Sequence, residues 1–160
     1  MSALLSFEPS MRSPLFDLLV LVARVDPMIA APQLGAVRGA QIALGLVELP
    51  SLDGAVLRPS TGEWRALGGA SDRERSLAYA AARWVALSDG VLDDAEVKVL
   101  AELRRVLGLG DAAVRLAESI ANGVAWRARA ESIEPHRAFA LLVVETAKHA
   151  ARRRVLRAAA

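Results

Sequence analysis

The chain contains no cysteine, and aromatic residues make up only 4% of its 160 positions. Without cysteine it has no disulfides, thiolate metal ligands, iron–sulfur clusters or cysteine nucleophile, which fits a reducing compartment. It also lacks a glycine-rich phosphate loop after a strand and a serine in a G-x-S-x-G motif. The sequence therefore predicts a protein that is not an enzyme.

Charge of one sign is not in excess, because 20 lysines and arginines face 18 acidic residues, for a net charge of +2. We expect no specific nucleic-acid partner from this balance. The most apolar stretch, at residues 13–27, contains Asp17 and Arg24 and is shorter than the roughly 20 residues of a membrane span. The N-terminus lacks the pattern of a signal peptide. We expect a cytoplasmic protein that does not span a membrane.

Alanine and leucine are abundant, whereas glycine, proline and serine gather in separate clusters. This distribution predicts an all-α fold, a helical bundle of about six to eight helices in a single domain over residues 1–160. A glycine- and proline-rich linker is predicted at 47–70. Start and stop signals predict helices at 14–25, 32–44, 71–88, 94–107, 111–122 and 135–157, with a short segment around Trp126.

Part of the sequence is repeated. Residues 22–46 align without a gap on residues 85–109, at an offset of 63 positions. Six positions are identical, including Asp26 with Asp89, and three more are apolar in both copies. The alignment predicts a duplicated helix–turn–helix, with repeat one at about 14–46 and repeat two at about 71–109, related by a pseudo-two-fold axis. The C-terminal helices at 111–157 follow.

The second repeat holds the densest acidic cluster, with four carboxylates between positions 89 and 96. Their spacing matches the second half of an EF-hand calcium loop. The positions that would open such a loop are Val85 and Leu87, which are apolar and offer no oxygen ligand. An EF-hand is therefore excluded.

The surrounding pattern is more informative. It consists of an apolar helix ending in Ala86-Leu87-Ser88-Asp89-Gly90, then Leu92, the helix start Asp93 to Glu96, and Leu107-Gly108-Leu109. This pattern resembles the tellurite-resistance TerB family over about residues 77–109 and, through the first repeat, over 16–46. The resemblance implies an all-helical bundle of two similar halves without enzymatic activity. It also implies a bacterial role in tellurite or general stress response, alongside membrane and calcium-binding partners.

The resemblance further implies a divalent-cation site for calcium, magnesium or manganese. Carried over to this chain, its ligands would be Asp89, Asp93 and Glu96, with Asp26 from the matching turn of the first repeat. The first repeat departs from the pattern, because the positions equivalent to Gly90, Asp93 and Glu96 carry Pro27, Ala30 and Gln33. Hard cations prefer six or more oxygen ligands, so the sequence predicts weak binding.

The same carboxylates have a structural interpretation. Asp93 followed by Glu96 three residues later forms a capping box, which stabilises a helix start by about 0.5–2 kcal/mol. Asp89-Gly90 then serves only to end the preceding helix. A helix cap, a cation site and a protein-docking surface stay open as alternatives, and the first two are compatible.

The last predicted helix is rich in basic residues, namely Lys148, Arg152, Arg153, Arg154 and Arg157. They can simply complement the helix dipole at a solvated C-terminus. They also suit an anionic membrane surface or an acidic partner, whereas the aromatic side chains that stack on nucleic-acid bases are missing.

The histidines and tryptophans are interpreted as structural. His136 and His149 lack the companions of a zinc site and are expected to be solvated or at a helix end. Trp64, Trp84 and Trp126 are expected as core or half-buried anchors, with Trp64 in the linker as the alternative candidate for partner contact.

Two functions follow from these observations. The first is a TerB-like stress or tellurite-resistance module that binds protein partners and a divalent cation at the acidic turn. The alternative is an adaptor or scaffold without metal, whose basic C-terminal helix binds a membrane surface or an acidic partner.

Overall fold

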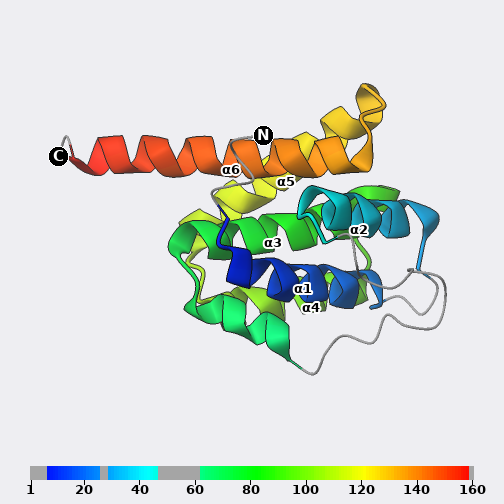
Figure 1. Cartoon of the computed structure of the whole chain (residues 1–160), viewed down its shortest axis with the longest axis horizontal. Helices are drawn as coiled ribbons and strands as arrows, with labels where there is room; N and C mark the ends of the chain where they lie inside the picture. The colour runs from blue at the N-terminus through cyan, green and yellow to red at the C-terminus, as the bar shows by residue number, and fades with distance from the viewer. Residues whose placement is uncertain (1–6, 26–28, 47–61, 159–160) are drawn as a thin grey trace.

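The computed structural model describes residues 7–25, 29–46 and 62–158, and within those ranges it is an all-α bundle without strands (Figure 1). The six-to-eight-helix bundle expected from the sequence is confirmed. The α-helices are α1 (Arg12–Ala23), α2 (Ala31–Ala43), α3 (Asp72–Ala86), α4 (Asp94–Leu107), α5 (Asp111–Ala130) and α6 (Pro135–Ala158). The described residues also form 3₁₀ helices, namely η2 (Pro9–Met11) before α1, η3 (Glu63–Gly69) before α3 and η4 (Leu87–Asp89) between α3 and α4.

α3 is the central helix, and it contacts each of the other five α-helices. Its sequence explains this position, because alanines at 78 and 80–82 let neighbouring helices approach closely on several sides. A helix that is apolar nearly all round is stable only when surrounded. Its first turn is fixed by a capping box, in which Ser71 Oγ accepts from Glu74 N and Glu74 Oε2 accepts from Ser71 N.

The two helix pairs correspond at the predicted offset of 63 residues. α1 ends at Ala23 and α3 at Ala86, while α2 begins at Ala31 and α4 at Asp94. Their C-terminal caps also match: Gly45 and Gly108 both adopt left-handed φ values, of 71° and 62°. The leucine after each glycine donates to a carbonyl five residues earlier, at 3.1 and 3.2 Å. These correspondences support the duplication.

Two predicted helix ends are wrong. The sequence places an N-cap at Ser13, but α1 already begins at Arg12 because η2 leads directly into it. The sequence also ends a helix at Asn122-Gly123, whereas α5 continues through this point to Ala130. Gly123 is exposed, so it costs the helix only about 1 kcal/mol in propensity, while residues on both sides of it pack into the core.

Part of the predicted linker is structured. Residues 63–69 form η3, whose Leu67 is fully buried and which packs against α1 and α4. The remainder of the predicted linker, at 47–61, lies outside the described residues.

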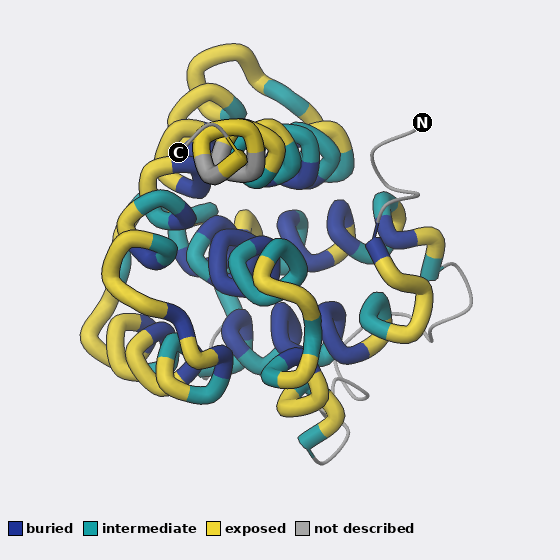
Figure 2. Tube along the Cα trace, turned by 90° about the vertical axis from the view of Figure 1, so that its left-hand side faces the viewer, coloured by how far each residue is buried: buried dark blue, intermediate teal, exposed yellow. Residues whose placement is uncertain are grey.

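α6 lies across the bundle and continues beyond it. Its first half packs on α2, α3 and α5 and buries Phe139, Leu142 and Val143. Its C-terminal part extends past the other helices (Figure 1). In Figure 2, which views α6 nearly along its axis, the described residues at this end are mostly coloured as exposed. No helix within the described ranges combines the length and apolar character needed to cross a membrane.

The contact between α2 and α6 depends on a glycine. A Cβ atom at Gly39 would lie 2.5 Å from Pro135 Cβ and 2.7 Å from His136 N, closer than atoms can approach without movement. Gly35, one turn earlier on α2, has nothing within 4 Å of the same position. Of the two glycines spaced four apart, only Gly39 permits close helix packing.

We therefore predict opposite effects for two alanine substitutions on α2. Gly39→Ala should lower the free energy of unfolding by about 1–3 kcal/mol, because the added methyl forces α6 outward. Gly35→Ala should raise it by up to about 1 kcal/mol through helix propensity. Urea denaturation of both variants measures this difference, and equal effects would contradict the packing assigned to Gly39.

Candidate functional site

The acidic turn connects α3 to α4 through η4. Gly90 ends η4 in a left-handed conformation with φ of 100°, which a side chain would strain. Asp89 is exposed, and its Oδ1 accepts a hydrogen bond from Val91 N at 3.0 Å. This contact closes the turn and directs the chain toward α4.

α4 starts with the capping box that the sequence predicts. Asp93 Oδ1 accepts from Glu96 N at 2.7 Å, and Glu96 Oε2 accepts from Asp93 N at 3.0 Å. Two backbone donors that a helix start leaves without partners are thereby satisfied. The structural interpretation of these two carboxylates is confirmed.

Glu96 has a second role, because its side chain is buried in the bundle with only 2% exposed. Its Oε1 accepts a hydrogen bond of 2.6 Å from Nε2 of Gln33, which is also 2% exposed. Gln33 lies on α2, at the position equivalent to Glu96 in the first repeat. The two equivalent side chains thus meet each other, as expected for halves that face one another across an axis.

The sequence predicts that α4 buries Val97, Leu100, Leu103 and Leu107. The three leucines are buried as expected, but Val97 is 50% exposed. The buried stripe instead runs Glu96, Leu100, Leu103, Leu107, and in α2 it runs Gln33, Val37, Ala40, Leu44 at the same offset. Each stripe therefore has a polar residue at the position nearest the helix start, and these two polar residues pair.

No positively charged group of a described residue donates a hydrogen bond to the Gln33–Glu96 pair. Within the described residues both oxygens of Glu96 accept from uncharged donors, and Gln33 Oε1 is buried without a hydrogen-bond partner. Burial is the main cause that raises the pKa of Glu96 above its ordinary value, and the nearby carboxylates of Asp93 and Asp89 raise it further. The backbone bond from Asp93 and the Gln33 amide oppose this shift only in part. A buried carboxylate of this kind gains from taking up a proton or a cation.

The predicted cation ligands are only partly assembled. Asp93 and Glu96 are joined by the capping box, Asp89 lies exposed on the turn, and Asp26 lies outside the described residues. In the described part of the chain no three acidic or histidine side chains are grouped closely enough to hold a metal ion. Gln33 Oε1, which the sequence pattern does not single out, is a buried oxygen without a partner on the side chain that bonds to Glu96.

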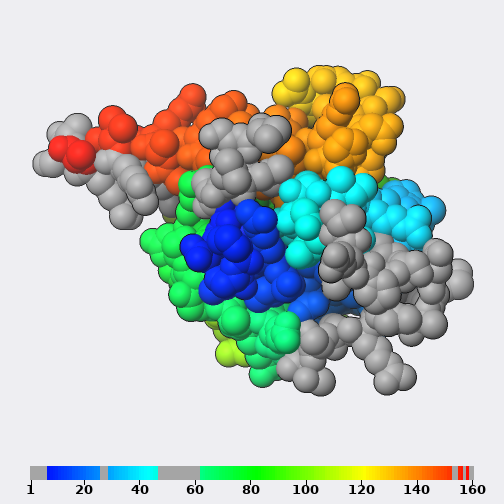
Figure 3. Space-filling view, viewed as in Figure 1, coloured from blue at the N-terminus to red at the C-terminus, as the bar shows by residue number. Residues whose placement is uncertain are grey.

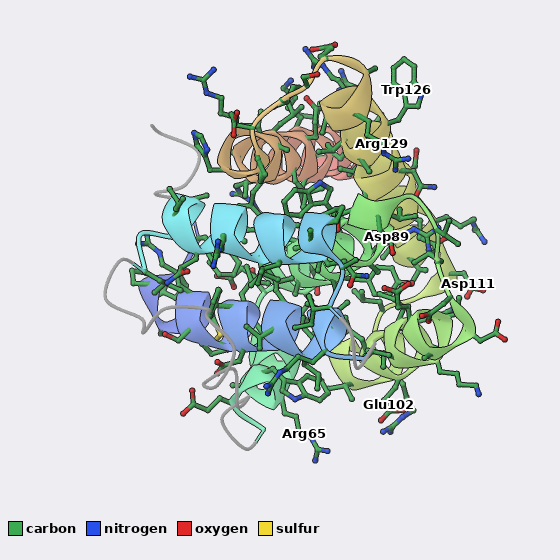
Figure 4. All side chains as sticks on the ribbon, turned by 90° about the vertical axis from the view of Figure 1, so that its right-hand side faces the viewer. Arg65, Asp89, Glu102, Asp111, Trp126 and Arg129 are labelled. Carbon is green, nitrogen blue, oxygen red and sulfur yellow. The ribbon has the colours of Figure 1, made fainter. Side chains whose placement is uncertain are left out.

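A basic and aromatic face adjoins the turn. Arg129 of α5 donates from Nη2 to the carbonyl of Leu87 at 3.2 Å. Trp126, one helical turn earlier, is 72% exposed, so the prediction of a core or half-buried anchor is wrong for this residue. Trp84 is buried against Phe139 and Trp64 is half-buried, as expected. Figure 4 shows Trp126 and Arg129 above Asp89 on the same side of the molecule.

The two histidines lie apart on α6. His136 is in its first turn and His149 is near its middle, and both are half-buried. Beyond His149 the helix exposes Arg152, Val155 and Leu156, the last two at 69% and 71%.

Comparison with known proteins adds no relative, because neither family models nor curated proteins nor solved structures gave a match to this chain.

The charge at Glu96 predicts a defined pH dependence. Because the native pKa exceeds the unfolded value, the native state binds a proton more tightly, and its stability falls as pH rises from about 4.3 through the native pKa. Glu96→Gln removes the ionisable carboxyl group while keeping an oxygen for the cap, so it should remove this fall. Urea denaturation of both proteins between pH 4 and pH 8 measures the difference.

Glu102 on the same helix is the matched control. It is exposed, and a hydrogen bond from Arg105 lowers its pKa. Glu102→Gln should therefore leave the fall in stability above pH 4.3 in place. If the free energy of unfolding depends on pH in the same way in wild type and Glu96→Gln, the claim that Glu96 is an uncompensated buried carboxylate is contradicted.

Proposed function

We propose that the protein is a non-enzymatic helical interaction module that docks on an anionic membrane surface through the C-terminal end of α6. This segment, residues 148–158, is called the α6 end below. The TerB resemblance of the α3–α4 turn supports placing the module in the bacterial cytoplasm, in tellurite or general stress response. Its membrane-associated and protein partners would then meet at the surface on which it docks.

The observation that carries this proposal is that the α6 end extends beyond the bundle while exposing apolar side chains among basic ones. Figure 3 shows the outer part of the segment standing clear of the remaining helices, while His149 and Ala150 at its start are half-buried. Lys148, Arg152, Val155 and Leu156 fall on one side of the helix by their spacing, and all four are exposed. A basic helix with apolar side chains among its cations suits the interface of an anionic bilayer.

The sequence explains why this end leaves the bundle. The buried stripe of α6 passes through Phe139, Leu142 and Thr146 and reaches positions 153 and 157 by helical spacing. Arginine occupies both positions, so the stripe offers no apolar side chain there that would pack against the bundle. Glu145 is the only acidic residue in α6, and it is paired with Lys148.

The charge is sufficient for membrane attraction. Each lysine or arginine near an anionic surface contributes about 1 kcal/mol at physiological ionic strength. The segment carries five such residues in sequence, of which Lys148 is paired with Glu145, so the attraction should be measurable and should weaken with salt.

We predict that the protein sediments with vesicles of phosphatidylcholine and phosphatidylglycerol but not with phosphatidylcholine alone. Replacing two arginines, Arg152→Gln with Arg154→Gln, should weaken binding by roughly 2 kcal/mol, about thirtyfold. The paired substitution Val155→Ser with Leu156→Ser should weaken it as well, because apolar insertion is lost.

Matched substitutions elsewhere serve as controls. Arg115 on α5 and Ile42 on α2 are exposed, and Arg115→Gln with Ile42→Ser should leave vesicle binding within about twofold. Binding that survives the α6 substitutions, or that is equal on uncharged vesicles, would contradict docking through the α6 end. Capture of an acidic protein by this segment in the absence of vesicle binding would do the same.

One observation favours cation binding at the acidic turn as a second candidate function. Gln33 Oε1 is a buried oxygen without a partner beside the uncompensated Glu96 carboxylate, and a cation would satisfy both. Gln33, Glu96 and Asp93 would hold it, with Asp89 and water completing the oxygen shell. Calcium, magnesium and manganese all accept such ligands.

A thermal melt tests this candidate. Chelator-treated protein titrated with each of the three ions should show a saturable rise in Tm. Gln33→Glu should enlarge the rise by adding a charged ligand, and Gln33→Leu should abolish it. If no ion raises Tm, or if the rise is equal in Gln33→Leu, cation binding at this pair is contradicted.

A further inference from the structure

The basic and aromatic face beside the acidic turn contains a shallow hollow, between the end of α3 and the C-terminal half of α5. Its lining includes Arg83 at the end of α3, Leu87 of η4, and Asn122, Trp126 and Arg129 of α5. Large exposed aromatic side chains are concentrated at binding surfaces, where tryptophan and arginine supply most of the affinity. Trp126 is the most exposed of the large apolar side chains among the described residues.

The charge of the hollow is of one sign, because it has two guanidinium groups and no carboxylate among its lining residues. Arg83 donates from Nη1 to Glu118 at 3.2 Å and from Nε to Asn122 Oδ1 at 3.0 Å, so it is held at the edge. Arg127, on the other side of α5, pairs with Glu131. Arg129 makes no ion pair with a described residue.

Arg129 is nevertheless fixed in place. Its Nη2 is anchored on the carbonyl of Leu87, and its Nη1 lies against Gly90, where a Cβ would come within 3.0 Å of it. A Cβ at position 90 would crowd the guanidinium in this position. An arginine already ordered by backbone contacts loses little further freedom when it binds a carboxylate.

We propose that this hollow binds an acidic peptide segment of a partner protein, with a carboxylate on Arg129 and an apolar side chain against Trp126. Charge complementarity selects the carboxylate, since arginine binds it through two parallel hydrogen bonds. The indole provides the apolar contact one helical turn away on the same face of α5. The hollow is separate from the α6 end, so this proposal does not depend on membrane docking.

The test uses the full chain and a fluorescein-labelled hexapeptide, Leu-Asp-Glu-Leu-Asp-Leu, with a free C-terminus. Fluorescence polarisation should give saturable binding that weakens about tenfold or more in Trp126→Ala and in Arg129→Gln. Arg115→Gln on the same helix removes the same charge outside the hollow and should change the Kd by less than about twofold. The paired α6 substitution, Arg152→Gln with Arg154→Gln, should have equally little effect.

Two comparisons separate peptide recognition from nonspecific charge attraction and from loss of the fold. The hexapeptide with asparagine, glutamine and a C-terminal amide in place of its acids should not bind. Thermal melts should show that Trp126→Ala, a change on the surface, leaves Tm unaltered. Equal binding of the uncharged peptide, unchanged binding in Trp126→Ala, or full displacement of the peptide by inorganic phosphate or a DNA oligonucleotide would overturn the proposal.

Discussion

The buried hydrogen bond between Gln33 and Glu96 constrains how the two halves of the bundle pack against each other. It joins α2 to the start of α4, and it does so at positions that otherwise belong to two apolar stripes. Removing either partner alone leaves the other polar group buried and unsatisfied, which costs more than the bond itself contributes. The pair therefore favours one register of the two helix pairs over alternatives that apolar packing alone permits.

Glu96 serves this contact and the capping box with one carboxylate. One oxygen fixes the start of α4 and the other reaches across to α2, so the local structure of the turn and the packing of the halves are coupled. The same turn also orders Arg129, which donates a hydrogen bond to the carbonyl of Leu87 and packs against Gly90. A change of protonation or a bound cation at Glu96 would thus act on an element that borders the basic hollow.

Much of the fold follows from local signals in the sequence. The capping boxes at Ser71 and Asp93 and the glycine at position 108 mark helix ends that the structure places at the same residues. The signals that fail are those that tertiary packing overrides. Asn122-Gly123 resembles a helix end, but burial on either side of it carries α5 through.

The site is less accessible to sequence reasoning for a related reason. A glutamate is ordinarily placed on the solvent side of a helix, so the pattern assigns the stripe of α4 to Val97 instead of Glu96. The repeat contains the missing information, because Gln33 and Glu96 occupy equivalent positions and both precede three apolar residues at helical spacing. No comparable pattern in the sequence indicates that Trp126 is exposed, since a tryptophan on a helix is more often buried.

The most direct test of the Gln33–Glu96 hydrogen bond is a double-mutant cycle. It compares the free energy of unfolding of Gln33→Leu, Glu96→Leu and the variant that carries both substitutions. Each single variant should be destabilised, because it leaves one buried polar group without its partner. The double variant should recover much of the loss, giving a coupling energy of about 1–3 kcal/mol between the two positions. Additive losses, with a coupling energy near zero, would contradict the claim that this pair couples α2 to the start of α4.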